Sequence, residues 1–163
     1  MGFNGAPIAT TGGTFTIQDN VVVSDNGLDD VISLGGGPGS TFRFNTVVNL
    51  SGENDTANSV DCFDAGLDVS DNIIAWNTSN APTCPTEYTL FDNVVALPPG
   101  EGNQVGDAST FFVDMANKNF HLAPGSPAIG AAQPGVSAPT DFDGNPRPAP
   151  SGTNADVGAF ESP

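Results

Sequence analysis

A six-residue unit occurs four times in this chain and constrains its fold more than any other feature. Each copy has an apolar residue at its first and last positions and an asparagine at its fourth. The copies occupy residues 17–22, 42–47, 69–74 and 90–95. Their asparagines, which lie 25, 27 and 21 residues apart, are Asn20, Asn45, Asn72 and Asn93. A repeat of this period predicts a stack of similar structural units.

The spacing inside the unit predicts a bend at the asparagine. The two apolar positions are five residues apart, and an odd spacing puts them on opposite faces of a continuous strand. Both face one core only if the chain turns between them. Asparagine tolerates the left-handed backbone region better than most residues, so we expect it to form the corner. Stacked corner asparagines are then expected to bond to one another as a ladder.

Strand, corner, strand and a longer loop together make one coil of a parallel β-helix. The sequence therefore predicts an all-β chain, a right-handed parallel β-helix of about four to five coils with an irregular C-terminal cap. We assign residues 1–97 to the coils and residues 98–163 to the last coil and the capping tail, within one continuous domain. A β-sandwich is the alternative, but it is expected to show hairpin turns every ~8–12 residues.

The charge of the chain limits its partners. Lys and Arg number 3 and Asp and Glu number 19, which gives a net charge of −16. Such a surface repels phosphate backbones and anionic lipid, so we predict no nucleic-acid partner and no membrane insertion. It either attracts divalent cations or simply keeps the chain soluble. The 37% of hydrophobic residues, including 11 Phe, predicts a folded chain rather than a disordered one.

The acidic residues before the corners suggest a second consequence of stacking. Asp19, Asp71 and Asp92 each precede the asparagine of a repeated unit. Stacked coils would bring these like charges together along one edge. The carboxylates are then expected either to point into solvent or to hold calcium between coils.

The two cysteines occupy nearly the same position in consecutive coils. Cys62 and Cys84 precede their repeated units by seven and six residues and are 22 residues apart. Neighbouring coils bring such positions within disulfide distance, so we predict a bridge formed in an oxidising compartment. Two free buried thiols are the alternative. The bridge and the low Lys content predict a secreted or cell-surface protein.

The tail carries two acidic motifs that are quite specific as a pair. They are Asp-Phe-Asp-Gly-Asn-Pro-Arg at 141–147 and Asp-Val-Gly-Ala-Phe-Glu at 156–161, and Phe-His-Leu precedes them at 120–122. This series resembles the C-terminal region of secreted bacterial β-helix proteins of the pectate-lyase-like repeat and choice-of-anchor type. The resemblance covers roughly residues 105–163. It implies a bacterial-type secreted or surface-displayed protein that is often concerned with polysaccharide.

The first acidic motif has two interpretations. Its oxygen-bearing side chains alternate around a glycine, a pattern that suits calcium. These candidate ligands are Asp141, Asp143 and Asn145. Alternatively the motif is a turn held by Arg147, which would pair with Asp141, Asp143, Asp156 or Glu161.

Glycoside hydrolysis would need two carboxylates flanking a cleft. The best acidic cluster is Asp25, Asp29 and Asp30, which loosely resembles the acidic pairs of polygalacturonases, and Asp61 with Asp64 is a second. A polysaccharide lyase is less favoured than a hydrolase. It would need a base and cations, and the chain's basic side chains match no lyase arrangement: Arg43, Lys118, His121 and Arg147.

These features favour a non-enzymatic extracellular module for surface display or for polysaccharide or matrix binding. It would require no cofactor. A carbohydrate-active enzyme and a calcium-dependent adhesin are the alternatives. We expect the tail to cover the open edge of the last coil. The N-terminal coil would leave its own edge open for edge-to-edge self-association.

Overall fold

The computed structural model describes residues 8–24, 32–50, 60–75, 82–92 and 96–163. Within these residues the chain forms 14 short strands and two short 3-10 helices. The strands hold two to four residues each, and Gly- or Pro-containing turns separate many of them. The chain is all-β, as the sequence predicts.

Twelve of the strands follow one another in a repeating order along the chain. The first coil holds β1 (Ile8–Thr10), β2 (Thr16–Gln18) and β3 (Val21–Ser24). The second holds β4 (Ile32–Leu34), β5 (Thr41–Arg43) and β6 (Thr46–Asn49). The third holds β7 (Val60–Cys62), β8 (Asp68–Ser70) and β9 (Ile73–Ala75). The fourth holds β10 (Thr86–Glu87) and β11 (Leu90–Asp92), and the fifth β12 (Gln104–Gly106).

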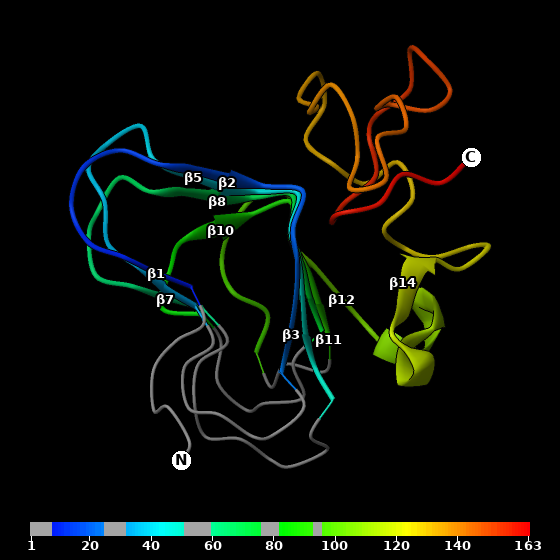
Figure 1. Ribbon diagram of the computed structural model, residues 1–163, viewed down its shortest axis with the longest axis horizontal. Helices are drawn as coiled ribbons and strands as arrows, with labels where there is room; N and C mark the ends of the chain where they lie inside the picture. Colours follow the sequence, from blue (N-terminus) through cyan, green and yellow to red (C-terminus); the bar gives the residue numbers. More distant parts are fainter. Residues whose placement is uncertain (1–7, 25–31, 51–59, 76–81, 93–95) are drawn as a thin grey trace.

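Equivalent strands of successive coils pair in parallel and form three sheets. Sheet A has the order β1-β4-β7, sheet B has β2-β5-β8-β10, and sheet C has β3-β6-β9-β11-β12. Figure 1 shows the three sheets arranged around a common core, with the tail beside sheet C. Each strand therefore stacks on the strand one coil earlier, which is a β-helix-like arrangement.

The register stacks the apolar positions of the repeated unit. Ile17 pairs with Phe42 and Phe42 with Val69, while Val47 pairs with Ile74. These side chains belong to an inner core shared by the three sheets, whose buried members are Ile32, Leu34, Phe42, Val47, Val60, Leu67, Val69, Ile74, Cys84 and Phe91. The apolar stripe in the sequence is thus the inside of the stack.

The corner lies one residue earlier than predicted. The left-handed backbone occurs at Asp19 (φ 55°), Phe44 (φ 51°) and Asp71 (φ 57°), so the expectation that asparagine itself adopts it is wrong. The residue after the corner is the one whose side chain reaches the next coil. Asparagine is needed there for its amide, and the preceding residue adopts the strained conformation.

The asparagine amides bond from coil to coil. The Asn45 Oδ1 accepts hydrogen bonds from Asn20 N (3.1 Å) and Nδ2 (3.0 Å). The Asn72 Oδ1 accepts equivalent bonds from Asn45 N (2.9 Å) and Nδ2 (3.2 Å). Asn45 and Asn72 are fully buried, so these bonds satisfy polar groups that water cannot reach.

The predicted register of the fourth coil is wrong. Val69 pairs with Thr86 and Ile73 with Leu90, and the corner is at Tyr88 (φ 45°). Thr89 therefore occupies the asparagine position, and its N–H donates to Asn103 Oδ1 of the fifth coil (3.0 Å). The connection between β9 and β10 is shorter than the corresponding connections between earlier coils. The sequence alignment therefore placed the fourth unit too late in the chain. The predicted ladder member Asn93 lies outside the described residues.

The disulfide prediction is confirmed. Cys62, at the end of β7, is bonded to Cys84, which precedes β10, with a Cα–Cα distance of 5.0 Å. The bridge links the third coil to the fourth. No cysteine is free.

The tail packs against the side of the stack. It begins with two 3-10 helices, Ala108–Thr110 and Met115–Asn117, and an antiparallel pair, β13 (Phe112–Asp114) and β14 (Asn119–Leu122). Its apolar residues form an outer core with Phe44, Val48, Ile73 and Leu90. The tail members of this core include Phe111, Phe112, Phe120, Leu122, Val157, Ala159 and Phe160.

Sheet C is therefore buried on both faces. Val47, Ile74 and Phe91 point into the inner core, whereas their neighbours Val48, Ile73 and Leu90 belong to the outer one. This explains why the strands of sheet C are continuous apolar runs. The tail covers the outer face of sheet C, and no described strand pairs with the free edge of β12.

Candidate functional site

A buried guanidinium lies where the tail meets the coils. The side chain of Arg147 is 0% exposed, and its guanidinium lies 4.6 Å from the centre of the Phe44 ring. Its terminal nitrogens donate to two tail carbonyls, those of Asp156 (2.8 Å) and Gly158 (3.1 Å). The planar group thus stacks on an aromatic face while its edge is hydrogen-bonded, an arrangement that suits arginine.

Two carboxylates lie beside this guanidinium without accepting a short hydrogen bond from it. Asp19 Oδ1 of the first coil and Glu161 Oε2 of the tail both lie 3.6 Å from its nitrogens. The predicted pairing of Arg147 with the tail acids is thus seen at Glu161, whereas Asp156 contacts it through the backbone carbonyl. The Asp19 contact was not predicted, because nothing local in the sequence connects residues so far apart.

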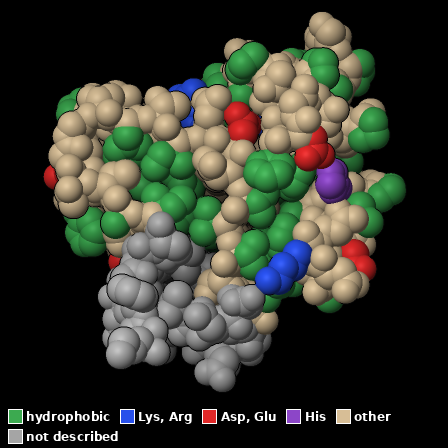
Figure 2. Space-filling model, viewed as in Figure 1, with side chains coloured by type: hydrophobic (Ala, Val, Ile, Leu, Met, Phe, Trp, Pro, Cys, Tyr) green, Lys and Arg blue, Asp and Glu red, His purple; other side chains and the backbone are tan. Residues whose placement is uncertain are grey.

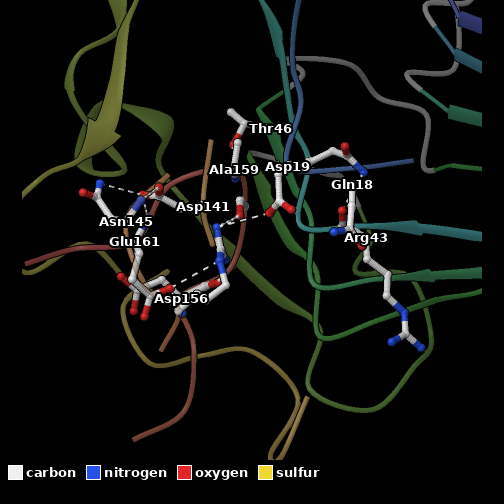
Figure 3. Close-up of polar contacts among 12 residues, drawn as sticks. Gln18, Asp19, Arg43, Thr46, Asp141, Asn145, Asp156, Ala159 and Glu161 are labelled. Carbon is white, nitrogen blue, oxygen red and sulfur yellow. Dashed lines mark hydrogen bonds and ion pairs between the residues drawn. The ribbon is translucent and has the colours of Figure 1, made fainter. Parts of the chain in front are cut away.

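Figure 3 shows the acids of this junction, among them Asp19 and Glu161. Burial changes the pKa of both. Burial raises the pKa of Asp19 from 3.8 to about 6, and the opposing effect of Arg147 is smaller. Burial also raises the pKa of Glu161, although the backbone N–H groups of Ala149 and Asp156 donate to its carboxylate. Desolvation disfavours the charged form of each group.

The third coil contributes a further buried acid. Asp71 is 0% exposed and lies at a corner. Burial raises its pKa even though Gln133 N (2.7 Å) and Ser70 Oγ (3.1 Å) donate to its carboxylate. Asp71 therefore ties the tail to the coils by a hydrogen bond from Gln133.

The expected column of stacked carboxylates is absent from the described residues. Phe44 occupies the corner between Asp19 and Asp71. Asp92 lies in β11 instead of at a corner, and it accepts a hydrogen bond from Ala108 N (2.9 Å). The aromatic corner keeps the first and third carboxylates apart, so stacking creates no calcium site there.

The Asp141 carboxylate holds a turn together. Its Oδ1 accepts from the backbone N–H groups of Asp143 (3.0 Å) and Asn145 (2.8 Å). Its Oδ2 accepts from Asn145 Nδ2 (3.2 Å) and Glu161 N (3.0 Å). Burial opposes ionisation, yet these hydrogen bonds lower the pKa of Asp141. The geometry supports the turn interpretation of the motif, and the described residues contain no cluster of three metal-binding side chains.

A groove of about 550 Å³ opens on the tail. Its walls include the rings of Pro146, Pro148 and Pro150. The other residues lining it are His121, Asp143, Asn145, Ala149, Ser151, Glu161, Ser162 and Pro163. Figure 2 shows hydrophobic side chains gathered along the junction of coils and tail and over parts of the tail surface.

The ionisable side chains of this groove, those of His121, Asp143 and Glu161, already have partners inside the chain. His121 Nε2 lies 2.7 Å from Asp143 Oδ2, and Nδ1 lies 2.7 Å from Asn119 Oδ1. The imidazole also stacks on Phe160 with ring centres 4.4 Å apart. Glu161 accepts from Ala149 N (2.8 Å) and Asp156 N (3.1 Å). The groove therefore offers shape and ring surfaces rather than a free acid or base.

A second groove, of about 530 Å³, lies between sheet C and the start of the tail. Two carboxylates line it, with opposite pKa shifts. Burial raises the pKa of Asp92, and the neighbouring Asp107 adds to the effect. Hydrogen bonds from Ser109 lower the pKa of Asp107. The sequence search for paired acids missed these two, because the fold alone brings them to one groove.

Of the catalytic candidates from the sequence, the structure describes only Asp61 and Asp64. Asp25, Asp29 and Asp30 lie outside the described residues. Asp61 accepts a hydrogen bond from Thr83 Oγ1 (3.1 Å), and Asp64 is exposed.

Comparisons with protein-family models, with curated proteins and with solved structures return no match. The described part of the chain contains no helix long and apolar enough to cross a membrane.

Proposed function

We propose that this chain is a right-handed parallel β-helix module of a bacterial-type extracellular protein, which presents its tail groove to a polysaccharide or matrix ligand without catalysing a reaction. The repeating parallel strand order supports the architecture, and parallel crossover connections are right-handed in nearly all proteins. The Cys62–Cys84 bridge is consistent with an oxidising compartment. The tail motifs that resemble those of secreted β-helix proteins support the same location.

The observation that carries the binding proposal is the groove lined by His121 and four proline rings. Ring faces supply apolar contact area, and the hydroxyl groups of Ser151 and Ser162 remain for orienting a ligand. Each ionisable group there is held by an internal partner. The net charge of −16 favours a neutral glycan over a uronate.

Calorimetric titration with neutral and uronate polysaccharides tests this proposal. We expect a neutral glycan to bind and His121→Ala to weaken binding at least about fivefold, a loss of about 1 kcal/mol. The exposed Phe63, on the coils, gives the matched control Phe63→Ala, which should bind normally. Equal binding by both variants, or no glycan binding by the wild type, would contradict the proposal.

The second groove supports a glycoside hydrolase as the alternative function. Two carboxylates with pKa values moved apart are the pattern of an acid and a base. Asp92 would then be the proton donor and Asp107 the base or nucleophile. A reducing-end assay decides between the functions. Activity that Asp92→Asn or Asp107→Asn abolishes, and Glu87→Gln retains, would establish the enzyme and reject the non-catalytic module.

Self-association through the N-terminal coil is a further part of the proposal. β1, β2 and β3 stand at the ends of their sheets, so each has one edge without a partner strand among the described residues. Such edges can pair with another chain. Light scattering at raised protein concentration should detect the association, most strongly in high salt that screens the acidic charge. A monomer under every condition argues against it.

A further inference from the structure

The backbone of the tail is hydrogen-bonded to the second and third coils by a small number of specific contacts. Ala159 N donates to Thr46 Oγ1 (2.9 Å), and Gly158 N donates to the Asp71 carbonyl (3.0 Å). A Cβ at Gly158 would lie 2.6 Å from Ile73 Cδ1. Only glycine therefore lets the tail backbone pack this closely against the Ile73 side chain. These amides report directly on whether the tail is docked.

The charges at this junction are strongly unbalanced. One guanidinium, from Arg147, is buried there. The carboxylates around it or in contact with the same tail segments are those of Asp19, Asp71, Asp141, Asp156 and Glu161. Buried charges need partners of opposite sign or several hydrogen bonds. The stability of a junction with this composition is expected to change with pH.

The five carboxylates differ in how well hydrogen bonds hold their charge. Asp141 accepts four bonds. Asp156 accepts from the N–H groups of Gly130 and Ser162, and Glu161 accepts from two further N–H groups. Asp19 is the exception, because its Oδ1 is buried and has no hydrogen-bond partner. Its charge is favoured by the guanidinium 3.6 Å away and by a side-chain hydrogen bond from Gln18, and neither supplies a donor to the buried Oδ1.

We propose that docking of the tail is coupled to protonation of Asp19, so that mild acid tightens the junction between tail and coils and a rise in pH loosens it. Ionised Asp19 leaves a buried oxygen without a donor, whereas the protonated carboxyl removes one negative charge from a junction that has an excess of them. The Asp19–Arg147 contact joins the first coil to the tail.

The direction of the effect follows from the pKa of Asp19. Burial raises it from 3.8 to about 6 in spite of Arg147. The docked state therefore binds the proton more tightly than the undocked state does. The resulting stabilisation is fully present below pH 3.8 and is lost as the pH rises through about 6.

Other charged groups near the junction do not reverse this direction. Burial acts on Asp71 in the same sense, and the more distant Arg43 and Asp68 influence that carboxylate with opposite signs. The negative charge of Asp141 also raises the pKa of Asp19, although by less than burial does. Arg147 and a side-chain hydrogen bond from Gln18 oppose protonation of Asp19, but together they do not outweigh the effect of burial. The guanidinium of Arg147 stays charged throughout.

Amide hydrogen exchange of the intact chain tests the proposal. Protection factors of the Gly158 and Ala159 amides, corrected for intrinsic exchange at each pH, should fall at least about tenfold between pH 5 and pH 7. Asp19→Asn is uncharged and nearly isosteric, so it should reduce this fall to the part that Asp71 and Glu161 contribute and should raise protection at pH 7 above that of the wild type. The exposed acid Glu87, on β10, provides the control Glu87→Gln, which should behave as wild type.

Three results would overturn the proposal. Protection in the wild type could be independent of pH, or the fall could be as large in Asp19→Asn as in the wild type. Alternatively Asp19→Asn could lose protection at both pH values, which would show that the ionised carboxylate holds the tail through Arg147. A carboxyl NMR titration of the wild type provides an independent readout if the variant does not fold. A midpoint near 6 supports the coupling, and one near 3.8 contradicts it.

Discussion

Arg147 of the tail lies over the ring of Phe44, the corner residue of the second coil, at 4.6 Å from its centre. The aromatic side chain is itself 2% exposed. The corner residue is aspartate in the first and third coils but phenylalanine in the second. The guanidinium packs against this phenylalanine ring. The contact fixes where along the stack the tail docks.

Replacement of this arginine should destabilise the chain strongly. We expect Arg147→Lys to lower the free energy of unfolding by about 2–4 kcal/mol, because an ammonium group cannot stack on Phe44 and also reach two carbonyls. Urea unfolding followed by circular dichroism measures the change. Arg43, whose side chain is 29% exposed and pairs with Asp68, gives the control. Arg43→Lys should cost less than about 1 kcal/mol, and equal costs would contradict this assignment.

The stability that each asparagine of the ladder contributes should depend on its position in the stack. Asn72→Ala removes an acceptor of two bonds and a donor to the Phe42 and Ser70 carbonyls, all in a buried site. We expect a loss of about 2–4 kcal/mol in unfolding free energy. Asn20→Ala, at the less buried first coil, should cost about half as much. The ladder would not be a main source of stability if both variants unfolded as the wild type does.

Reduction of the Cys62–Cys84 bridge should weaken the middle of the stack. The bond closes a loop of 22 residues in sequence separation, for which the chain-entropy model gives about 3 kcal/mol. We expect a lower melting temperature in reductant. The double variant Cys62→Ser, Cys84→Ser should melt at this lower temperature and should not respond to reductant. An unchanged melting temperature for reduced wild type would contradict the expectation.

The Asp141 turn predicts how the stability of the chain changes at low pH. The pKa of Asp141 is lowered, so its stabilising effect is present above the ordinary value of 3.8 and is lost as the pH falls below it. Asp141→Asn should cost about 1–3 kcal/mol at neutral pH and flatten the loss of stability in acid. Thermal melts from pH 2 to pH 7 measure both effects.

The same turn predicts indifference to chelators, because backbone and amide donors already occupy the carboxylate. A wild-type melting temperature that falls on addition of a calcium chelator would restore the calcium interpretation.

The sequence predicted the strands and the inner core because both follow from local alternation of apolar residues. It misplaced the corner by one residue, because the pattern shows that a bend is needed but not which neighbour bears the strain. It misaligned the fourth coil because Thr89 replaces asparagine while the apolar alternation of β11 imitates the unit. The site at Arg147 depends on a contact with Asp19, which no local pattern reveals.

The two-sided burial of sheet C has a consequence for biosynthesis. Its strands come from residues 21–106, and their outer cover comes from the residues after them. A chain emerging N-terminus first from a ribosome or an export channel would thus present a bare apolar sheet until its final segment is released. Emergence of residues 107–163, rather than formation of the coils, would decide when this part of the nascent chain stops being a target for chaperones.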